Sequence, residues 1–230
     1  AAAPRVVGAR CRVVDGGPWL IAALFVEAGG VYTGLDDVDP WDEQRDARLY
    51  DGPHAVVAHP PCQRWGRYWH GGPSAKVRRV LGDDGGCFIA AIDAVEAWGG
   101  VLEHPEASHA WRAHGIDAPS KRGGWIRSRV GWTCCVEQGH YGHRARKATW
   151  LYAVTSDPPS LIWGPSAGER LDEGFHTAAE RRAARDAGRA PRKRLSTAEN
   201  LATPIAFRDV LLGIAKSCRT PRPQSAPPPR

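Results

Sequence analysis

Residues 56–63, with the sequence Val-Val-Ala-His-Pro-Pro-Cys-Gln, predict a buried strand that ends abruptly beside a cysteine. Val56 and Val57 favour a strand, and the two prolines end it because neither has an N–H for sheet pairing. In an open α/β sheet, ligands bind at the strand ends. Cys62 is therefore a candidate nucleophile, since a stiff Pro-Pro turn holds its thiol in place. The alternative is a small buried thiol beside a structural turn.

The residues that follow predict a βαβ unit. An aspartate cap and apolar residues at helical spacing indicate a helix over residues 86–98, which Gly99-Gly100 ends. Val101-Leu102 then begin a strand that stops at Glu103-His104-Pro105. Both strand ends of a βαβ unit lie on one edge of the sheet, so Cys62 and Glu103 are expected to face one crevice. The pattern predicts an α/β fold with a mostly parallel sheet flanked by helices.

Composition limits the class of protein. The chain has 230 residues and a formal net charge of +6, which fits one domain, over residues 1–219, with an anionic partner such as nucleic acid. Residues 220–230 are Pro-rich and are expected to be disordered. No apolar run reaches about 18 residues, so no membrane span is expected. The six cysteines form no C-x-x-C pair, which predicts reduced thiols, a cytoplasmic location and no metal site.

The N-terminal part leaves two interpretations open. Residues 21–26 favour a strand, and Gly29-Gly30 follow it. They form either the turn of a β-hairpin or a glycine loop where the backbone approaches a cofactor. In the acidic segment 36–43, Asp39 can hold ribose hydroxyls and Trp41 can stack on adenine. The alternative for this segment is a solvated turn with a hydrophobic plug.

Two basic segments predict contacts to nucleic acid. The glycine-bounded loop 63–72 alternates aromatic and cationic side chains, which stack on bases and bind phosphates, and its glycines suit a mobile lid. Core packing fits this composition less well. Residues 155–195 predict a short target-recognition segment that contains a basic helix, for which a solvated helix face is the alternative. The predicted contacts are Gln63, Arg64, Arg67, Arg181, Arg182 and Arg185.

Four motifs together resemble the DNA cytosine-5 methyltransferases. Pro61-Cys62-Gln63 resembles their nucleophile motif, and Glu103-His104-Pro105 is similar to their Glu-Asn-Val motif. Residues 136–152 resemble their Tyr-Gly-x-Pro-Gln-x-Arg-x-Arg segment, with Lys147 and Thr149 at the two arginine positions. Thr203-Pro204 and the helix after it look like the closing motif of the family. The motifs keep the family order over roughly residues 55–217, in a form similar to short phage-encoded relatives.

This resemblance implies a Rossmann-like methyltransferase fold, DNA as the substrate and S-adenosylmethionine as the donor. Cys62 then adds to C6 of a flipped cytosine, and Glu103 holds N3 and the exocyclic amine. Lys147 or a neighbouring arginine binds O2 and lowers the pKa of the thiol. Further nucleic-acid contacts are implied for Arg144, Arg146 and Thr149.

The N-terminal segment that is expected to bind the cofactor, residues 25–41, departs from the family pattern. Residues 25–30 are similar to its Phe-x-Gly-x-Gly-Gly loop, which implies cofactor contacts from Phe25, Gly29 and Gly30, but Glu27 replaces a glycine. Residues 30–39 are also too few for a full helix and a second strand. Three interpretations follow: a cytosine-5 methyltransferase, the same base chemistry with another donor or pyrimidine, and a non-enzymatic nucleic-acid-binding derivative.

Overall fold

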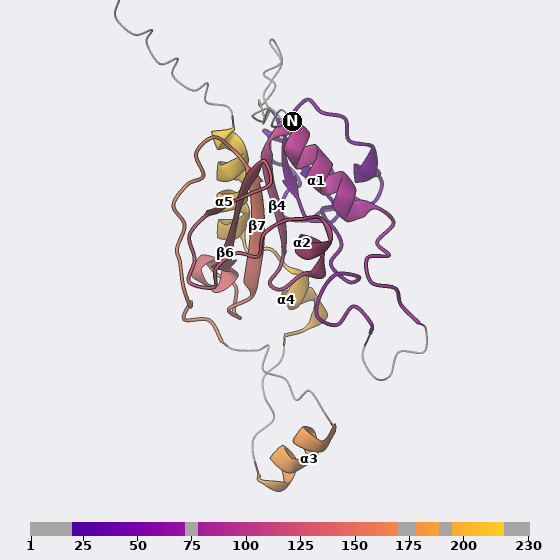
Figure 1. Ribbon diagram of the computed structural model, residues 1–230, viewed down its shortest axis with the longest axis vertical. Coiled ribbons are helices and arrows are strands. Elements are labelled where there is room, and N and C mark those ends of the chain that lie inside the picture. Colours follow the sequence, from indigo (N-terminus) through magenta and orange to yellow (C-terminus); the bar gives the residue numbers. More distant parts are fainter. Residues whose placement is uncertain (1–19, 72–77, 170–177, 189–194, 219–230) are drawn as a thin grey trace, which may run out of the picture.

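One seven-stranded sheet forms the middle layer of the fold (Figure 1). The computed structural model describes residues 20–71, 78–169, 178–188 and 195–218, so the predicted tail lies outside them. The strands are β1 (Ile21–Leu24), β2 (Val38–Trp41), β3 (Ala55–Ala58), β4 (Gly100–Pro105), β5 (Ile126–Ser128), β6 (Gly131–Glu137) and β7 (Ala148–Val154). The helices are α1 (Cys87–Trp98), α2 (His109–Ala113), α3 (Ala178–Asp186), α4 (Thr197–Leu201) and α5 (Ile205–Ser217), with 3₁₀ turns η1 (Ala47–Leu49) and η2 (Gln138–Tyr141). The predicted α/β class is confirmed.

Alternating side chains of the sheet form two separate cores. Ala22, Val56 and Leu102 point toward α1 and α2 and pack with Phe88 and Trp111. The intervening residues of the same strands point toward α5 on the opposite face. That second core includes Ile21, Ala23, Val57, Val101, Phe207, Leu211 and Ile214. Because both faces are covered, β1 and β3 are apolar throughout, as is usual for buried strands.

The sheet is mixed, with the strand order β2-β1-β3-β4-β7-β6-β5. Strands β1 to β4 are mutually parallel, whereas β7 is antiparallel to β4 and to β6, and β5 is antiparallel to β6. The expected mostly parallel sheet therefore describes only the half built by β1 to β4. The short connection from β6 to β7, residues 138–147, is shorter than a usual crossover between parallel strands, so these strands pair antiparallel.

The predicted βαβ unit is confirmed in β3, α1 and β4. Asp84 accepts hydrogen bonds from the N–H groups of Gly86 and Phe88 at the start of α1. Gly99, with φ of 77°, ends the helix. Ala58 is then paired with Leu102, so His59 and Glu103 come next on adjacent strands.

The β-hairpin interpretation of the N-terminal part is wrong. Strand β2 begins at Val38 and runs parallel to β1, with Ile21 opposite Val38. The connection over residues 25–37 consists of turns in the structure, without a helix. Its length is close to the dozen or so residues that a parallel crossover needs. By length alone, residues 30–39 are too few for both a helix and a second strand. The structure has the strand, β2, and no helix between it and β1.

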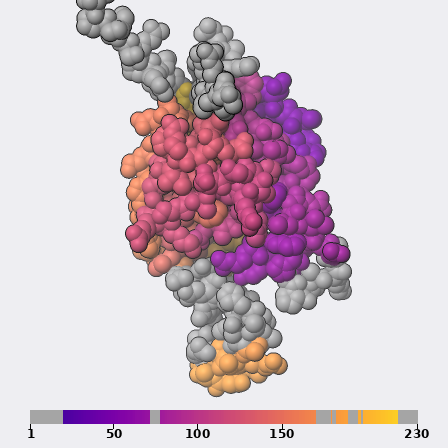
Figure 2. Space-filling view, viewed as in Figure 1, coloured from indigo at the N-terminus to yellow at the C-terminus, as the bar shows by residue number. Residues whose placement is uncertain are grey.

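Figures 1 and 2 both show α3 standing apart from the body formed by the sheet and its covering helices. Among the described residues, no helix has the length and apolar character that crossing a bilayer requires.

We expect Gly100→Ala to destabilise the protein by about 3 kcal/mol or more. Gly100 has φ of 121°, and a Cβ there would lie 1.9 Å from the carbonyl oxygen of Val56 in the neighbouring strand. The free energy of unfolding in urea measures the effect. The matched control is Gly213→Ala on the solvent-exposed face of α5, where nothing lies within 4 Å of the added Cβ. It should stabilise the protein by about 0.5–1 kcal/mol, and equal effects at both sites would contradict the argument.

Candidate active site

The carboxyl edge of strands β1, β3 and β4 brings together the candidate catalytic residues. The chain leaves β1 toward β2 on one side, and β3 then lies on the other side of β1. In open α/β sheets such a reversal of strand order is where ligands bind. His59 and Cys62 follow β3 directly, and Glu103 lies in the part of β4 that extends past β3. The topology thus places these residues beside the position where a ligand is expected.

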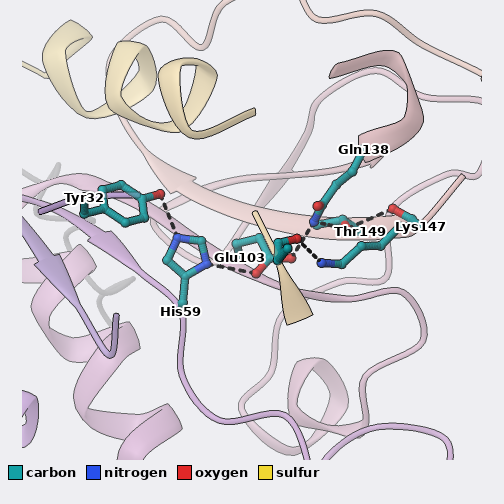
Figure 3. A network of polar contacts seen from close by, with 7 residues as sticks. Tyr32, His59, Glu103, Gln138, Lys147 and Thr149 are labelled. Carbon is teal, nitrogen blue, oxygen red and sulfur yellow. Dashed lines mark hydrogen bonds and ion pairs between the residues drawn. The ribbon is translucent and has the colours of Figure 1, made fainter. Parts of the chain in front are cut away.

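The Glu103 carboxylate is bound from two sides (Figure 3). His59 Nδ1 lies 3.1 Å from Oε2, and Gln138 Nε2 donates to Oε1 at 3.2 Å. The Tyr32 hydroxyl lies 2.8 Å from His59 Nε2, and Gln138 Nε2 also donates to Thr149 Oγ1 at 3.0 Å. The carboxylate is therefore the centre of a network that joins the β1–β2 connection, the end of β3, η2 and β7.

This network keeps Glu103 ionised. Its side chain is only 13% exposed, and burial by itself raises the pKa of the carboxyl group. The hydrogen bond from His59 and the electrostatic effects of His59 and Lys147 outweigh burial and lower the pKa of Glu103 below its ordinary value. A buried carboxylate held this way is suited to accept hydrogen bonds from a ligand.

Cys62 lies in the turn after Pro60-Pro61 and is half-buried. Its carbonyl oxygen accepts hydrogen bonds from the N–H groups of Trp65 and Gly66, which stabilises the turn. Burial and the charge of Glu103 raise the pKa of the thiol, and Lys147 opposes them. The expectation that Lys147 lowers the pKa of Cys62 is right for that one interaction and wrong for the net shift. The thiol is protonated at neutral pH.

Lys147 immediately precedes β7, with φ of 44°. Its ammonium group donates to the carbonyl oxygen of Ala202 at 2.8 Å. Burial lowers the pKa of Lys147, whereas the charges of Glu103 and Cys62 raise it. Cys62, Glu103 and Lys147 therefore act on one another electrostatically, as their common location at the sheet edge requires.

Several predicted nucleic-acid contacts have other partners in the structure. Thr149 is fully buried, and its hydroxyl serves Gln138 and the Lys147 carbonyl, so it cannot reach a bound strand. Arg144 forms an ion pair with Glu199 at 3.1 Å, and Arg146 Nε donates to the Gly168 carbonyl. The motif spacing placed these residues correctly near Lys147, but their side chains belong to the local fold.

The loop after Cys62 is partly a core element. Gln63 and Arg67 are exposed and Arg64 is half-buried, as a binding loop requires. Trp65 instead packs against Phe88, and its indole N–H donates to Asp84 at 2.7 Å. The expectation that this loop contributes little to the core is wrong for Trp65. Gly72, the last residue of the predicted lid, lies outside the described residues.

The predicted recognition segment divides into different parts. Residues 155–169 pack against the body: Trp163 lies over Gly123, and the Ile162 N–H donates to the Tyr141 hydroxyl. This part is therefore not a protruding insertion. In α3, Arg182 and Arg185 are exposed, and the side chain of Arg181 lies outside the described residues. Arg185 Nε lies 3.6 Å from Asp186 Oδ1, so these two side chains form an ion pair.

The residues predicted to hold adenosine fit it poorly. Asp39 lies within β2 rather than at its end, and it forms an ion pair with Arg45. Trp41 donates its indole N–H to Asp39, and the Arg45 guanidinium lies 4.0 Å from the centre of its ring. The carboxylate expected for ribose and one face of the indole expected for adenine are thus already engaged within the protein.

The glycine loop follows β1 at the point where strand order reverses. Phe25 has φ of 57°, and Gly29 has φ of 70°, a backbone conformation that favours glycine although the space around its Cα is open. A Cβ at Gly30 would lie 2.9 Å from the Glu27 carbonyl, so Gly30 serves the turn itself. These features explain the glycines without a cofactor. In the described part of the chain, no group of three or more His, Cys, Asp or Glu side chains could hold a metal ion.

Sequence reasoning missed three residues of the site: Tyr32, His59 and Gln138. His59 was within reach, because it lies between a predicted strand and the two prolines, at the same edge as Cys62. Tyr32 and Gln138 gave no signal, since each reaches the site from a turn that only the fold brings close. No family model matches this chain, and no curated protein matches it either.

Proposed function

We propose that the protein is a DNA cytosine-5-modifying enzyme, similar to a methyltransferase, in which Cys62 attacks C6 of a cytosine that has left the base stack. The observation that supports it is the meeting of Cys62, Glu103 and Lys147 at one edge of the sheet, with Glu103 clamped by His59 and Gln138. A thiol, a carboxylate and an ammonium group suit C6, the N3–N4 edge and O2 of cytosine, respectively.

The protonation states of Cys62 and Glu103 suggest where the thiol proton goes when sulfur adds to C6. In the free protein at neutral pH the Cys62 thiol holds a proton and Glu103 does not, and the upward shift of the Cys62 pKa and the downward shift of the Glu103 pKa reinforce both states. The thiol gives its proton to the Glu103 carboxylate, and sulfur forms a bond to C6. The electron pair of the C5–C6 double bond becomes a C4–C5 double bond, and the electron pair of the N3–C4 double bond moves onto N3, which takes the proton from Glu103. The product is an enamine whose C5 carries the nucleophilic electron density.

Lys147 can assist this step while keeping its contact with Ala202. An ammonium group has three N–H donors, and the Ala202 carbonyl uses one of them. A remaining N–H can bind cytosine O2 and stabilise negative charge on the ring. Exposed Arg67, Arg182 and Arg185, together with the positive net charge, suit phosphate contacts of a DNA partner.

A second candidate keeps this base activation but uses a different donor or a different pyrimidine. The engagement of Asp39 and Trp41 by Arg45 favours it, because the residues expected to hold S-adenosylmethionine have internal partners. No step is therefore assigned to S-adenosylmethionine here.

Exchange of the C5 hydrogen tests the proposal without a donor. The C6 adduct takes a solvent proton at C5 and loses the original hydrogen when sulfur departs, so the cytosine is regenerated. We expect DNA of mixed sequence, tritiated at cytosine C5, to release tritium into water in the presence of the protein. Single-stranded and duplex forms are compared, since a stacked base must first be flipped. Release from tritiated free nucleotide alone would favour another pyrimidine substrate. DNA binding with no release from any substrate would favour a non-enzymatic derivative.

A further inference from the structure

The two clamps on Glu103 differ in how they are held. Gln138 is buried, and Thr149 fixes its amide nitrogen. His59 projects from the end of β3, and its ring is held at the far nitrogen by Tyr32, which is 3% exposed (Figure 3). The side chains of Tyr32, His59 and Glu103 thus form a continuous chain of hydrogen bonds into the site.

The direction of these hydrogen bonds follows from their chemistry. The Glu103 carboxylate only accepts, so His59 Nδ1 must donate to it. In the neutral form of the ring the imidazole has a single N–H, which leaves Nε2 as an acceptor for the Tyr32 hydroxyl. Tyr32 keeps its proton because burial raises its pKa well above the ordinary value. Tyr32 therefore selects the His59 tautomer that points its N–H at Glu103.

Tyr32 comes from the β1–β2 connection, the segment whose glycines predicted a cofactor loop. This connection is anchored to α5, where Arg208 Nη1 donates to the Val31 carbonyl at 2.8 Å. The charges of Arg208 and Asp209 also reach the Tyr32 hydroxyl. The β1–β2 connection therefore has a structural role that requires no cofactor: it supplies the Tyr32 hydroxyl that contacts His59.

We propose that Tyr32 and His59 are positioning residues that orient the Glu103 carboxylate toward the base. The inference that this orientation serves catalysis rests on the proposed function. The effect of His59 and Tyr32 on Glu103 can be measured without any enzymatic activity. Around Glu103, the other titratable groups are Lys147 from the start of β7, His104 from β4 itself and Cys62 from the turn after β3.

The pKa of Glu103 is the first measurement, by ¹³C NMR of its carboxyl carbon. In His59→Ala the hydrogen bond from His59 is lost while the carboxyl group stays in the sheet, so the pKa should rise by about one unit or more. His59→Asn places an amide nitrogen where Nδ1 was and should keep most of the lowered value. Tyr32→Phe should give a smaller rise. The control His54→Asn, at the amino end of β3, should leave the Glu103 titration unchanged.

The pH profile of C5 hydrogen exchange is the second measurement. Exchange requires ionised Glu103, so the rate falls as pH drops through the pKa of Glu103. Because His59→Ala raises that pKa, its acidic limb should move to higher pH. At pH 7, where Glu103 is still ionised, loss of the orienting hydrogen bond should by itself lower the rate on the order of tenfold to a hundredfold. His59→Asn should recover most of the rate and the original limb.

Two results would overturn the inference. One is an unchanged Glu103 pKa in His59→Ala. The other is equal loss in His59→Ala and His59→Asn, which would indicate a packing role alone. If the unmodified protein shows no exchange on any substrate, the proposed function fails, and the NMR titration still decides whether His59 holds Glu103.

Discussion

Cys62→Ala is expected to abolish C5 hydrogen exchange while leaving DNA binding nearly unchanged. The alanine cannot form the bond to C6, and without that bond C5 does not become an enamine carbon. Loss of a nucleophile costs at least about 10³-fold in rate. Phosphate contacts come from other side chains, so the dissociation constant for DNA at fixed salt should change less than about threefold. Tritium release and fluorescence anisotropy measure the two properties on the same preparation.

Cys87→Ala is the matched control for this variant. Cys87 is also a half-buried free thiol whose pKa burial raises, but it begins α1 and interacts with Asp84 rather than Glu103. Its replacement should leave exchange intact. Full activity of Cys62→Ala would end the covalent mechanism, whatever the outcome with Cys87→Ala.

Glu103→Gln should lower the exchange rate on the order of a hundredfold or more. An amide can neither take the proton from Cys62 nor pass it to cytosine N3. The fold should tolerate the change, because the new amide oxygen can accept from His59. Gln138 Oε1, which has no hydrogen-bond partner among the described residues, can accept from the new amide after rotation of the Gln138 side chain. The rate per folded molecule, with folding checked by circular dichroism, tests this expectation.

The control for charge removal is Glu96→Gln in α1. Glu96 is also a partly buried carboxylate, held by Arg129 at 2.7 Å and by the Tyr152 hydroxyl at 2.7 Å, but it lies away from Cys62 in the fold. Its replacement should reduce stability and leave the exchange rate of the folded protein unchanged. A loss per folded molecule in Glu96→Gln as large as in Glu103→Gln would show that the effect is not specific to the Glu103 carboxylate.

Local sequence patterns were sufficient to predict the central βαβ unit formed by β3, α1 and β4. A β-branched run stopped by two prolines, a helix with regular apolar spacing and a strand after Gly99-Gly100 each follow from interactions within a few residues. Right-handed crossover then places Cys62 and Glu103 at one edge without further information. Lys147 came from a motif resemblance, and the structure brings it into electrostatic reach of both.

Other expectations failed where another side chain of the protein already supplied the partner. Asp39 and Trp41 looked available to a nucleotide, but Arg45 engages both. Thr149 looked like a nucleic-acid contact, but the strand buries it against Gln138. Trp65 looked like part of a mobile loop, but α1 provides an apolar surface and Asp84 for it. A sequence shows the type of each side chain and not its burial.

The sequence by itself determined the class of the fold, the order of its central elements and the edge at which the cysteine and the glutamate meet. These depend on backbone geometry and short-range periodicity, which every segment carries in its own residues. Only the tertiary structure decided the surroundings of the site: a Glu103 carboxylate bound by His59 and Gln138, a Cys62 thiol whose pKa burial raises, and a His59 ring in contact with Tyr32. Protonation and orientation depend on burial and on charges and hydrogen bonds from remote segments, which exist only once the chain has folded.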